Sequence, residues 1–134
     1  MNKICTTIEQ SKKLIELGID VYTADMYWWN CHGFKLSASP YTEEVKKGFE
    51  THCLECIPAW SLSALLEFIP PYLGEFSEGI DFGFGKAMNG KWYSAHYLQY
   101  LQDGNMKSVK TVTGDTAVDA AFEMICWLLE NKKI

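Results

Sequence analysis

The chain has 134 residues, of which 48% are hydrophobic and 14% aromatic, and its formal net charge is −5. This length and composition predict one globular domain over residues 1–134 and exclude a disordered chain. The negative charge argues against non-specific binding to nucleic acid or to an anionic membrane.

The N-terminal sequence and the cysteines indicate the cellular compartment. Residues 1–10 lack the apolar core of a secretory signal peptide. No apolar run reaches the roughly 18 residues that a membrane-spanning helix needs. We therefore expect a cytoplasmic protein without a membrane partner, whose five cysteines are reduced thiols or metal ligands. Their odd number also argues against a fully paired disulfide framework.

The first predicted element is a helix over residues 7–17. Its start carries a capping box, in which Thr6 pairs with Glu9 or Thr7 pairs with Gln10. Apolar side chains then recur at helical spacing along the segment.

Residues 19–56 give weaker signals. Residues 23–26 suit a short helical turn, and the aromatic residues 27–29 have strand character. A loop follows, within which residues 34–36 suit a short strand. Residues 42–56 lack a clean hydrophobic period and are either a short helix or a long loop.

A second helix is predicted over residues 61–69. Ser61 suits the N-cap position, and Pro70 stops the helix. Its apolar stripe should pack on the core.

Three strands are predicted after this helix, over residues 82–88, 91–101 and 106–113. Asn89-Gly90 predicts a type I′ hairpin between the first two, and residues 103–105 mark a second turn. The middle strand is partly apolar on both faces, which predicts a central position and leaves room for aromatic side chains on its exposed face. The third strand is rich in lysine and threonine, which predicts a solvated edge.

The C-terminal segment, residues 115–131, is the clearest amphipathic helix of the chain. Thr116 and Asp119 give a capping pattern at its start. Large apolar side chains cover one wide arc, and burying them stabilises the fold by on the order of 10 kcal/mol as an upper bound. Together these elements predict an α+β fold. An antiparallel β-meander of three or four strands packs against the C-terminal helix and against two helices from the N-terminal half.

Three stretches of the sequence carry a family resemblance. They are SKKLIELGID at residues 11–20 running on to TADMYW at 23–28, IPAWSLSALLEFIP at 57–70, and GDTAVDAAFEMICWLLEN at 114–131. They resemble a family of small uncharacterised proteins of gut Bacteroidetes and their phages or mobile elements. The family carries no known activity, so the resemblance implies a mobile-element context and no catalytic residue.

A cysteine–histidine cluster is the sharpest candidate site. Cys53 and Cys56 have the Cys-x-x-Cys spacing that lets two thiolates reach one zinc ion, and His52 with Cys31 or His32 would complete four ligands. The alternatives are ordinary reduced cysteines in a loop and a redox pair, which normally opens a long helix. The cluster lies outside the segments that carry the resemblance.

No segment predicts a catalytic reaction. The chain has no nucleophile elbow, no zinc-protease motif and no P-loop. His96 lies in a predicted strand among aromatic residues, where a packed or surface role is more common than general-base catalysis. We therefore expect no enzymatic activity, with an enzyme of unidentified reaction as the alternative.

A nucleic-acid role also has little support. Residues 82–86 weakly match the aromatic strand of an RNA-recognition motif, but Asp81 stands where a basic residue should precede it. Gly83 and Gly85 are better explained as glycines that allow close packing in a strand.

The surplus of tryptophan suggests a contact surface. Trp127 falls at the rim between the apolar arc and the acidic face of the C-terminal helix, and Trp28 and Trp29 lie in the aromatic strand. Aromatic residues in such places often anchor protein–protein contacts, although a rim tryptophan packed on its own domain is the alternative. The sequence therefore predicts a protein-interaction module that binds a partner protein or a second copy of itself.

Overall fold

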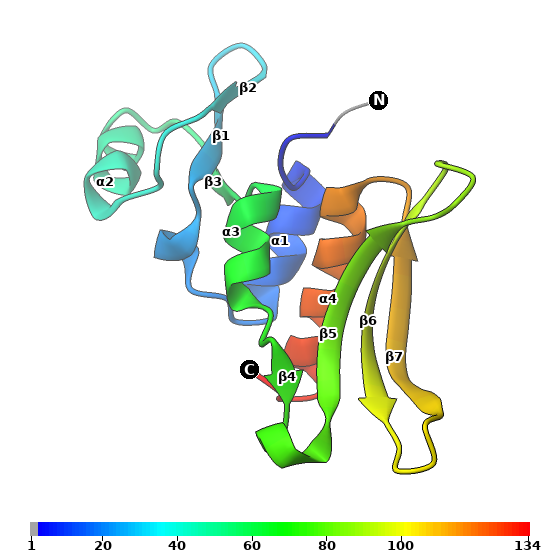
Figure 1. Ribbon diagram of the computed structural model, residues 1–134. Helices are drawn as coiled ribbons and strands as arrows, with labels where there is room; N and C mark the ends of the chain where they lie inside the picture. Colours follow the sequence, from blue (N-terminus) through cyan, green and yellow to red (C-terminus); the bar gives the residue numbers. More distant parts are fainter. Residues whose placement is uncertain (1–2) are drawn as a thin grey trace. The chain divides into compact units, whose positions relative to one another are not determined.

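The computed structural model describes residues 3–134 (Figure 1). The described residues form four α-helices, one antiparallel sheet of three strands and one of four. The predicted α+β class is therefore confirmed. Internal contacts divide the chain into two units, Ile4–Ala64 and Lys3 with Leu65–Ile134. The single domain over residues 1–134 stays a prediction.

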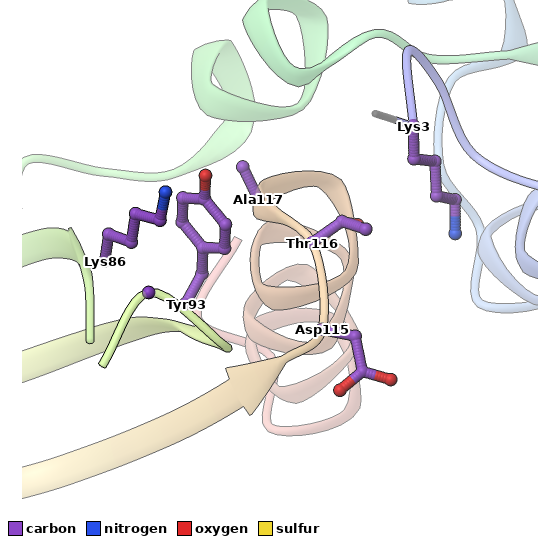
Figure 2. A pocket seen from close by; sticks show the side chains of 7 residues that line it. Lys3, Lys86, Tyr93, Asp115, Thr116 and Ala117 are labelled. Carbon is purple, nitrogen blue, oxygen red and sulfur yellow. The ribbon is translucent and has the colours of Figure 1, made fainter. Parts of the chain in front are cut away.

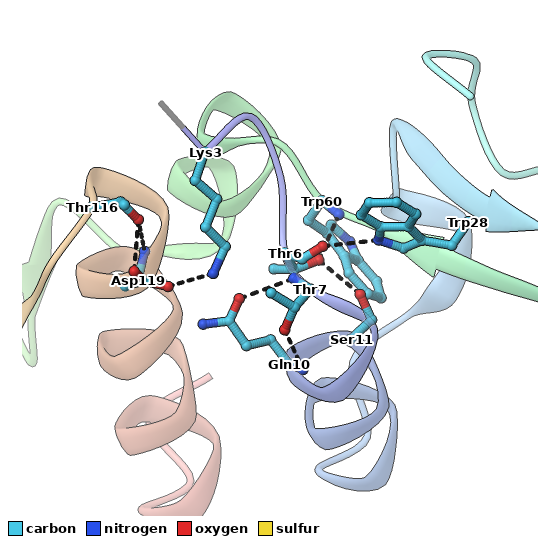
Figure 3. A network of polar contacts seen from close by, with 9 residues as sticks. All are labelled: Lys3, Thr6, Thr7, Gln10, Ser11, Trp28, Trp60, Thr116 and Asp119. Carbon is cyan, nitrogen blue, oxygen red and sulfur yellow. Dashed lines mark hydrogen bonds and ion pairs between the residues drawn. The ribbon is translucent and has the colours of Figure 1, made fainter. Parts of the chain in front are cut away.

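Helix α1, Ile8–Glu16, opens the first unit. Thr7 and Gln10 form the capping box: the Thr7 hydroxyl accepts from the Gln10 amide at 3.1 Å, and Gln10 Oε1 accepts from the Thr7 amide at 3.0 Å. Thr6, the other candidate cap, is buried. Its hydroxyl lies 2.8 Å from Ser11 Oγ and accepts from the Trp60 amide at 3.1 Å (Figure 3).

A three-stranded antiparallel sheet follows in the same unit, with the order β2-β1-β3. Strands β1, Met26–Asn30, and β2, Phe34–Ser37, confirm the two strands predicted in this region. Strand β3, Cys56–Ala59, was not predicted. It contains Pro58, which has no backbone donor and is tolerated because β3 is an edge strand.

The ambiguous stretch before β3 forms helix α2, Glu43–Thr51, rather than a long loop. The Thr42 hydroxyl caps it by accepting from the Val45 amide at 3.2 Å. None of its side chains is fully buried. The short helical turn lies at Val21–Thr23, slightly earlier than predicted, because the Asp20 carboxylate caps the Tyr22 amide.

Helix α3, Leu62–Phe68, confirms the second predicted helix. The Ser61 hydroxyl accepts from the Ala64 amide at 3.2 Å, as expected of an N-cap. The sequence boundary between the two units falls inside this helix.

The second unit contains a four-stranded antiparallel sheet with the order β4-β5-β6-β7. Its strands are β4, Tyr72–Leu73; β5, Ile80–Lys86; β6, Tyr93–Tyr100; and β7, Met106–Gly114. A 3-10 turn, η2 at Phe76–Glu78, joins β4 to β5. The β-meander is confirmed with β4 as its fourth strand, and β6 is central and β7 lies at an edge, as predicted.

The predicted type I′ turn at Asn89-Gly90 is wrong. The Ala87 amide donates to the Trp92 carbonyl at 2.8 Å, so a longer loop closes the hairpin between these residues. Gly90 has φ +71°, but Asn89 is not among the residues with positive φ. A type I′ turn needs positive φ at both central residues. The hairpin itself is present.

Helix α4, Ala117–Glu130, packs on β6 and β7 (Figure 1). Its buried residues are Val118, Ala120, Ala121, Phe122, Met124, Ile125, Cys126 and Leu128. The predicted apolar arc therefore faces the interior. Packing of the N-terminal-half helices on the meander stays a prediction. Within the described part of the chain, every helix is too short or too polar to cross a membrane.

Candidate functional site

One face of the four-stranded sheet is covered by α4. The ring centroids of Tyr97 on β6 and Trp127 on α4 lie 6.3 Å apart. Phe82 pairs with Tyr97 across β5 and β6, with ring centroids 5.4 Å apart, and the Phe84 ring stacks on Tyr93 at 6.2 Å. Paired and alternate residues share a face, so both phenylalanines point toward the α4 side. An RNA-recognition strand would expose these rings, so the arrangement gives that interpretation no support.

The opposite face of the sheet carries Gly83 and His96, which pair across β5 and β6. The imidazole lies directly over the glycine: a Cβ at Gly83 would be 2.2 Å from His96 Nε2. Gly83 therefore permits close packing, as its place in a strand suggested. The imidazole is half-buried against the sheet.

The same face carries exposed apolar and aromatic side chains at one end. Tyr100 pairs with Met106, and these residues are 56% and 59% exposed. Leu98 lies two residues before Tyr100 and pairs with Asp81 on β5. Asp81 in turn pairs with Tyr72 on β4, which is 40% exposed. We call Tyr72, Leu98, Tyr100 and Met106 the open-face patch. Alternation in β6 indicated two partly apolar faces, but it could not show which face α4 would cover.

Two of the predicted interaction residues have partners inside their own units. Trp127 is half-buried, with its ring against Tyr97. Trp28 is also half-buried, and its Nε1 donates to the Thr6 carbonyl at 3.0 Å (Figure 3). These contacts account for both indoles within the fold, and a role for them in binding a partner stays a prediction.

Trp29 belongs to an aromatic chain that runs from β1 to α2. Its ring lies 5.9 Å from Phe49, and the Lys35 ammonium lies 5.5 Å from its centroid. The chain continues through Phe49 to Tyr27, Tyr41 and Tyr22. Such contacts stabilise by about 0.5–1.5 kcal/mol each beyond the buried area. Trp29 therefore has a structural role as well as partial exposure.

The cysteine–histidine cluster does not assemble a metal site in the described part of the chain. Across residues 3–134, no three His, Cys, Asp or Glu side chains come together as a possible metal group. Cys31, Cys53 and Cys56 are free thiols. Burial raises the pKa of the Cys56 thiol to about 11. The zinc hypothesis thus gains no support from the geometry.

A polar cavity of about 290 Å³ lies where α4 begins (Figure 2). Its lining residues are Lys3, Lys86, Gly90, Tyr93, Asp115, Thr116 and Ala117. Lys3 Nζ is 2.5 Å from Asp119 Oδ1 (Figure 3). The Lys86 ammonium lies 5.8 Å from the Tyr93 centroid. Asp115 adds a negative charge. Positive and negative groups are therefore nearly balanced, which does not favour a strongly charged ligand.

Comparisons with protein-family models, with curated proteins and with solved structures gave no match for this chain. The resemblance to proteins of gut Bacteroidetes stays a prediction. In the second unit, the open-face patch places the exposed side chains of Tyr72, Tyr100 and Met106 on one face of the sheet, around the half-buried Leu98.

Proposed function

We propose that this chain is a non-enzymatic protein-interaction module that self-associates through the open-face patch. The observation that supports it is the adjacent pair Tyr100 and Met106, both more than half exposed on the sheet face opposite α4. Contiguous apolar side chains at a surface commonly mark protein contacts. Tyrosine suits such a contact because its ring is apolar while its hydroxyl stays hydrated.

The charge distribution favours a second copy as the occupant. Two chains of net charge −5 repel each other unless the surfaces that meet carry little charge. Lys107 and Lys110 of β7 lie on the α4 side of the sheet, whereas the exposed Asp81 pairs with both Tyr72 and Leu98 and so lies within the patch. A two-fold contact places a patch against its own copy, so it needs apolar groups rather than opposite charges.

We also propose a genetic context and a cellular compartment for this protein. The resemblance of three sequence segments supports a phage or mobile-element context, and the five free cysteines support the reducing environment of the cytoplasm. Expression from a native host, followed by fractionation, tests the compartment: recovery outside the cytosolic fraction would contradict it.

Sedimentation over a concentration series tests the self-association. We expect the wild type to increase in mass with concentration. The double variant Tyr100→Ser with Met106→Ser should associate at least about tenfold more weakly, since contact anchors carry most of the binding free energy. Met88→Ser is the matched control, because Met88 is fully exposed in the β5–β6 loop. A wild type that stays monomeric at the highest concentration would overturn the proposal.

Trp127→Ala distinguishes self-association through the open-face patch from the contact at Trp127 that the sequence predicted. Because Trp127 packs on Tyr97, the substitution should lower thermal stability and leave the association constant of the folded protein unchanged. Loss of association without loss of stability would instead show that Trp127 is part of the contact surface.

A further inference from the structure

Strand β7 presents an unpaired backbone edge. It is the outer strand of the β4-β5-β6-β7 sheet and spans Met106–Gly114. The Ala87 amide donates to Trp92, and the Tyr100 amide donates to Gly79, so the even-numbered residues of β6 direct their backbone groups toward β5. In an antiparallel ladder the odd-numbered residues then bond to β7.

This alternation identifies the outer groups of β7. Val112 pairs with Ala95 and is directed inward, so the neighbouring Thr111 and Thr113 direct their N–H and C=O groups outward. Both threonines are exposed. Within the described residues, no further strand pairs with this side of β7. The edge is therefore open to an added strand.

A β-bulge sets the charge pattern along this edge. Tyr97 pairs with Lys110 while Leu98 pairs with Ser108, so Val109 is an extra residue on β7. In a regular strand Lys107 and Lys110, three residues apart, would point to opposite faces. The extra residue brings both lysines to one face. The hydroxyls of Ser108 and Thr111 correspondingly lie 2.9 Å apart on the other face.

We propose that the β7 edge binds an extended acidic protein segment as an added strand. A strand laid beside β7 has alternate side chains next to the lysine face and next to the hydroxyl face. The segment that fits therefore alternates acidic residues with small apolar or β-branched ones. This partner differs from the second copy that meets the open-face patch, and it binds through the edge backbone.

The positive charge of the lysine face disfavours strand β7 of a second copy as the added strand. Side-by-side copies would bring their lysines together on one face, and like charges on neighbouring strands are destabilising. Lysine and a bulge are also the devices by which edge strands avoid unselective pairing. An acidic segment removes the repulsion and forms charge-assisted contacts. Asp103 and Asp115 flank β7 in the sequence, so the favourable stretch lies between them.

Fluorescence anisotropy with labelled synthetic peptides and the full chain tests the proposal. The probe alternates glutamate and valine along its length. One comparator alternates lysine and valine, and another has the composition of the probe with its glutamates in one block. We expect the alternating acidic peptide to bind at least about tenfold more tightly than either comparator, with affinity that falls as salt rises. Equal binding of the acidic and basic peptides would overturn the proposal.

Two variants locate the site on β7. Thr111→Pro removes an outward N–H and leaves the β6–β7 ladder in place, so peptide binding should be lost while the circular dichroism spectrum is retained. Lys107→Glu with Lys110→Glu should transfer the preference to the lysine peptide. This charge reversal decides the question if Thr111→Pro fails to fold. Unchanged selectivity in the folded charge-reversal variant would refute the site.

Tyr100→Ser is the control that separates the two proposals. Tyr100 is part of the open-face patch and lies on β6, away from the β7 edge backbone. Its substitution should weaken self-association and leave peptide affinity unchanged. A loss of peptide binding in this variant would show that the peptide uses the open-face patch instead of the edge.

Discussion

The contact between Gly83 and His96 shows how one residue without a side chain shapes a sheet surface. The imidazole occupies the space that a Cβ at position 83 would need, at 2.2 Å from Nε2. The glycine was predicted to mark close packing, but its partner on the neighbouring strand could not be identified from the sequence. Strand register, which depends on the whole hairpin, selects that partner.

Gly83→Ala should therefore destabilise the chain in a way that depends on His96. We expect the free energy of unfolding to fall by about 1–3 kcal/mol, the usual range for overpacking. In a His96→Ala background the same substitution should be neutral or slightly stabilising, because alanine is the better strand residue. Urea unfolding of the four proteins measures this coupling, and equal effects in both backgrounds would contradict it.

At the scale of elements, helix α4 is specified mostly by its own sequence. The Asp119 amide donates to the Thr116 hydroxyl at 3.1 Å, and that hydroxyl donates to the Asp119 carboxylate at 2.8 Å. The carboxylate also lies near the positive end of the helix dipole. These local contacts explain why the start of α4 could be predicted correctly.

Removing this cap should weaken the fold measurably. Thr116→Ala should lower the free energy of unfolding by about 1 kcal/mol, because the Asp119 amide loses its acceptor. Thr116→Ser keeps the hydroxyl and should retain most of the stability. Chemical denaturation of both variants provides the comparison, and equal losses in the two would show that the cap is not the cause.

At the scale of the whole molecule, each unit contains a buried tyrosine with a perturbed pKa. The Tyr97 hydroxyl donates to the Pro70 carbonyl at 2.6 Å, and burial raises its pKa from 10.0 to about 12. Burial, followed by nearby ionisable groups, raises the pKa of Tyr41 from 10.0 to about 12. Both side chains are more easily ionised in the unfolded chain. Their contribution to stability is therefore full below pH 10 and is lost as the pH rises toward 12.

Unfolding measured between pH 9 and pH 12 should show this loss, with the window set by the pKa values of both tyrosines. Tyr97→Phe should make the alkaline decline shallower, whatever stability it loses at neutral pH. A single domain predicts one cooperative transition that responds to both Tyr41→Phe and Tyr97→Phe. Two transitions, each sensitive to one substitution, would show two domains.

The sequence predicted helices and strands correctly where the residues that indicate them lie within the element itself. Capping residues marked the starts of α1, α3 and α4, and alternation with turn residues located the meander. Strand β3 was missed because Pro58 is a poor strand residue unless an edge position accommodates it. Helix α2 was ambiguous in the sequence, and in the structure it buries no side chain completely. The hairpin at Asn89-Gly90 was predicted, but its turn type was wrong, since loop length depends on where the paired strands end.

The sequence by itself therefore determined the fold class, the capped helices and the central position of β6. The tertiary structure alone decided which surface is available for contact. Period-two alternation marks two faces of a strand equally, and only the packing of α4 shows which one is covered. Likewise, only the register of β6 and β7 shows that an extra residue brings Lys107 and Lys110 to one face, because a bulge is a property of the pairing between two strands.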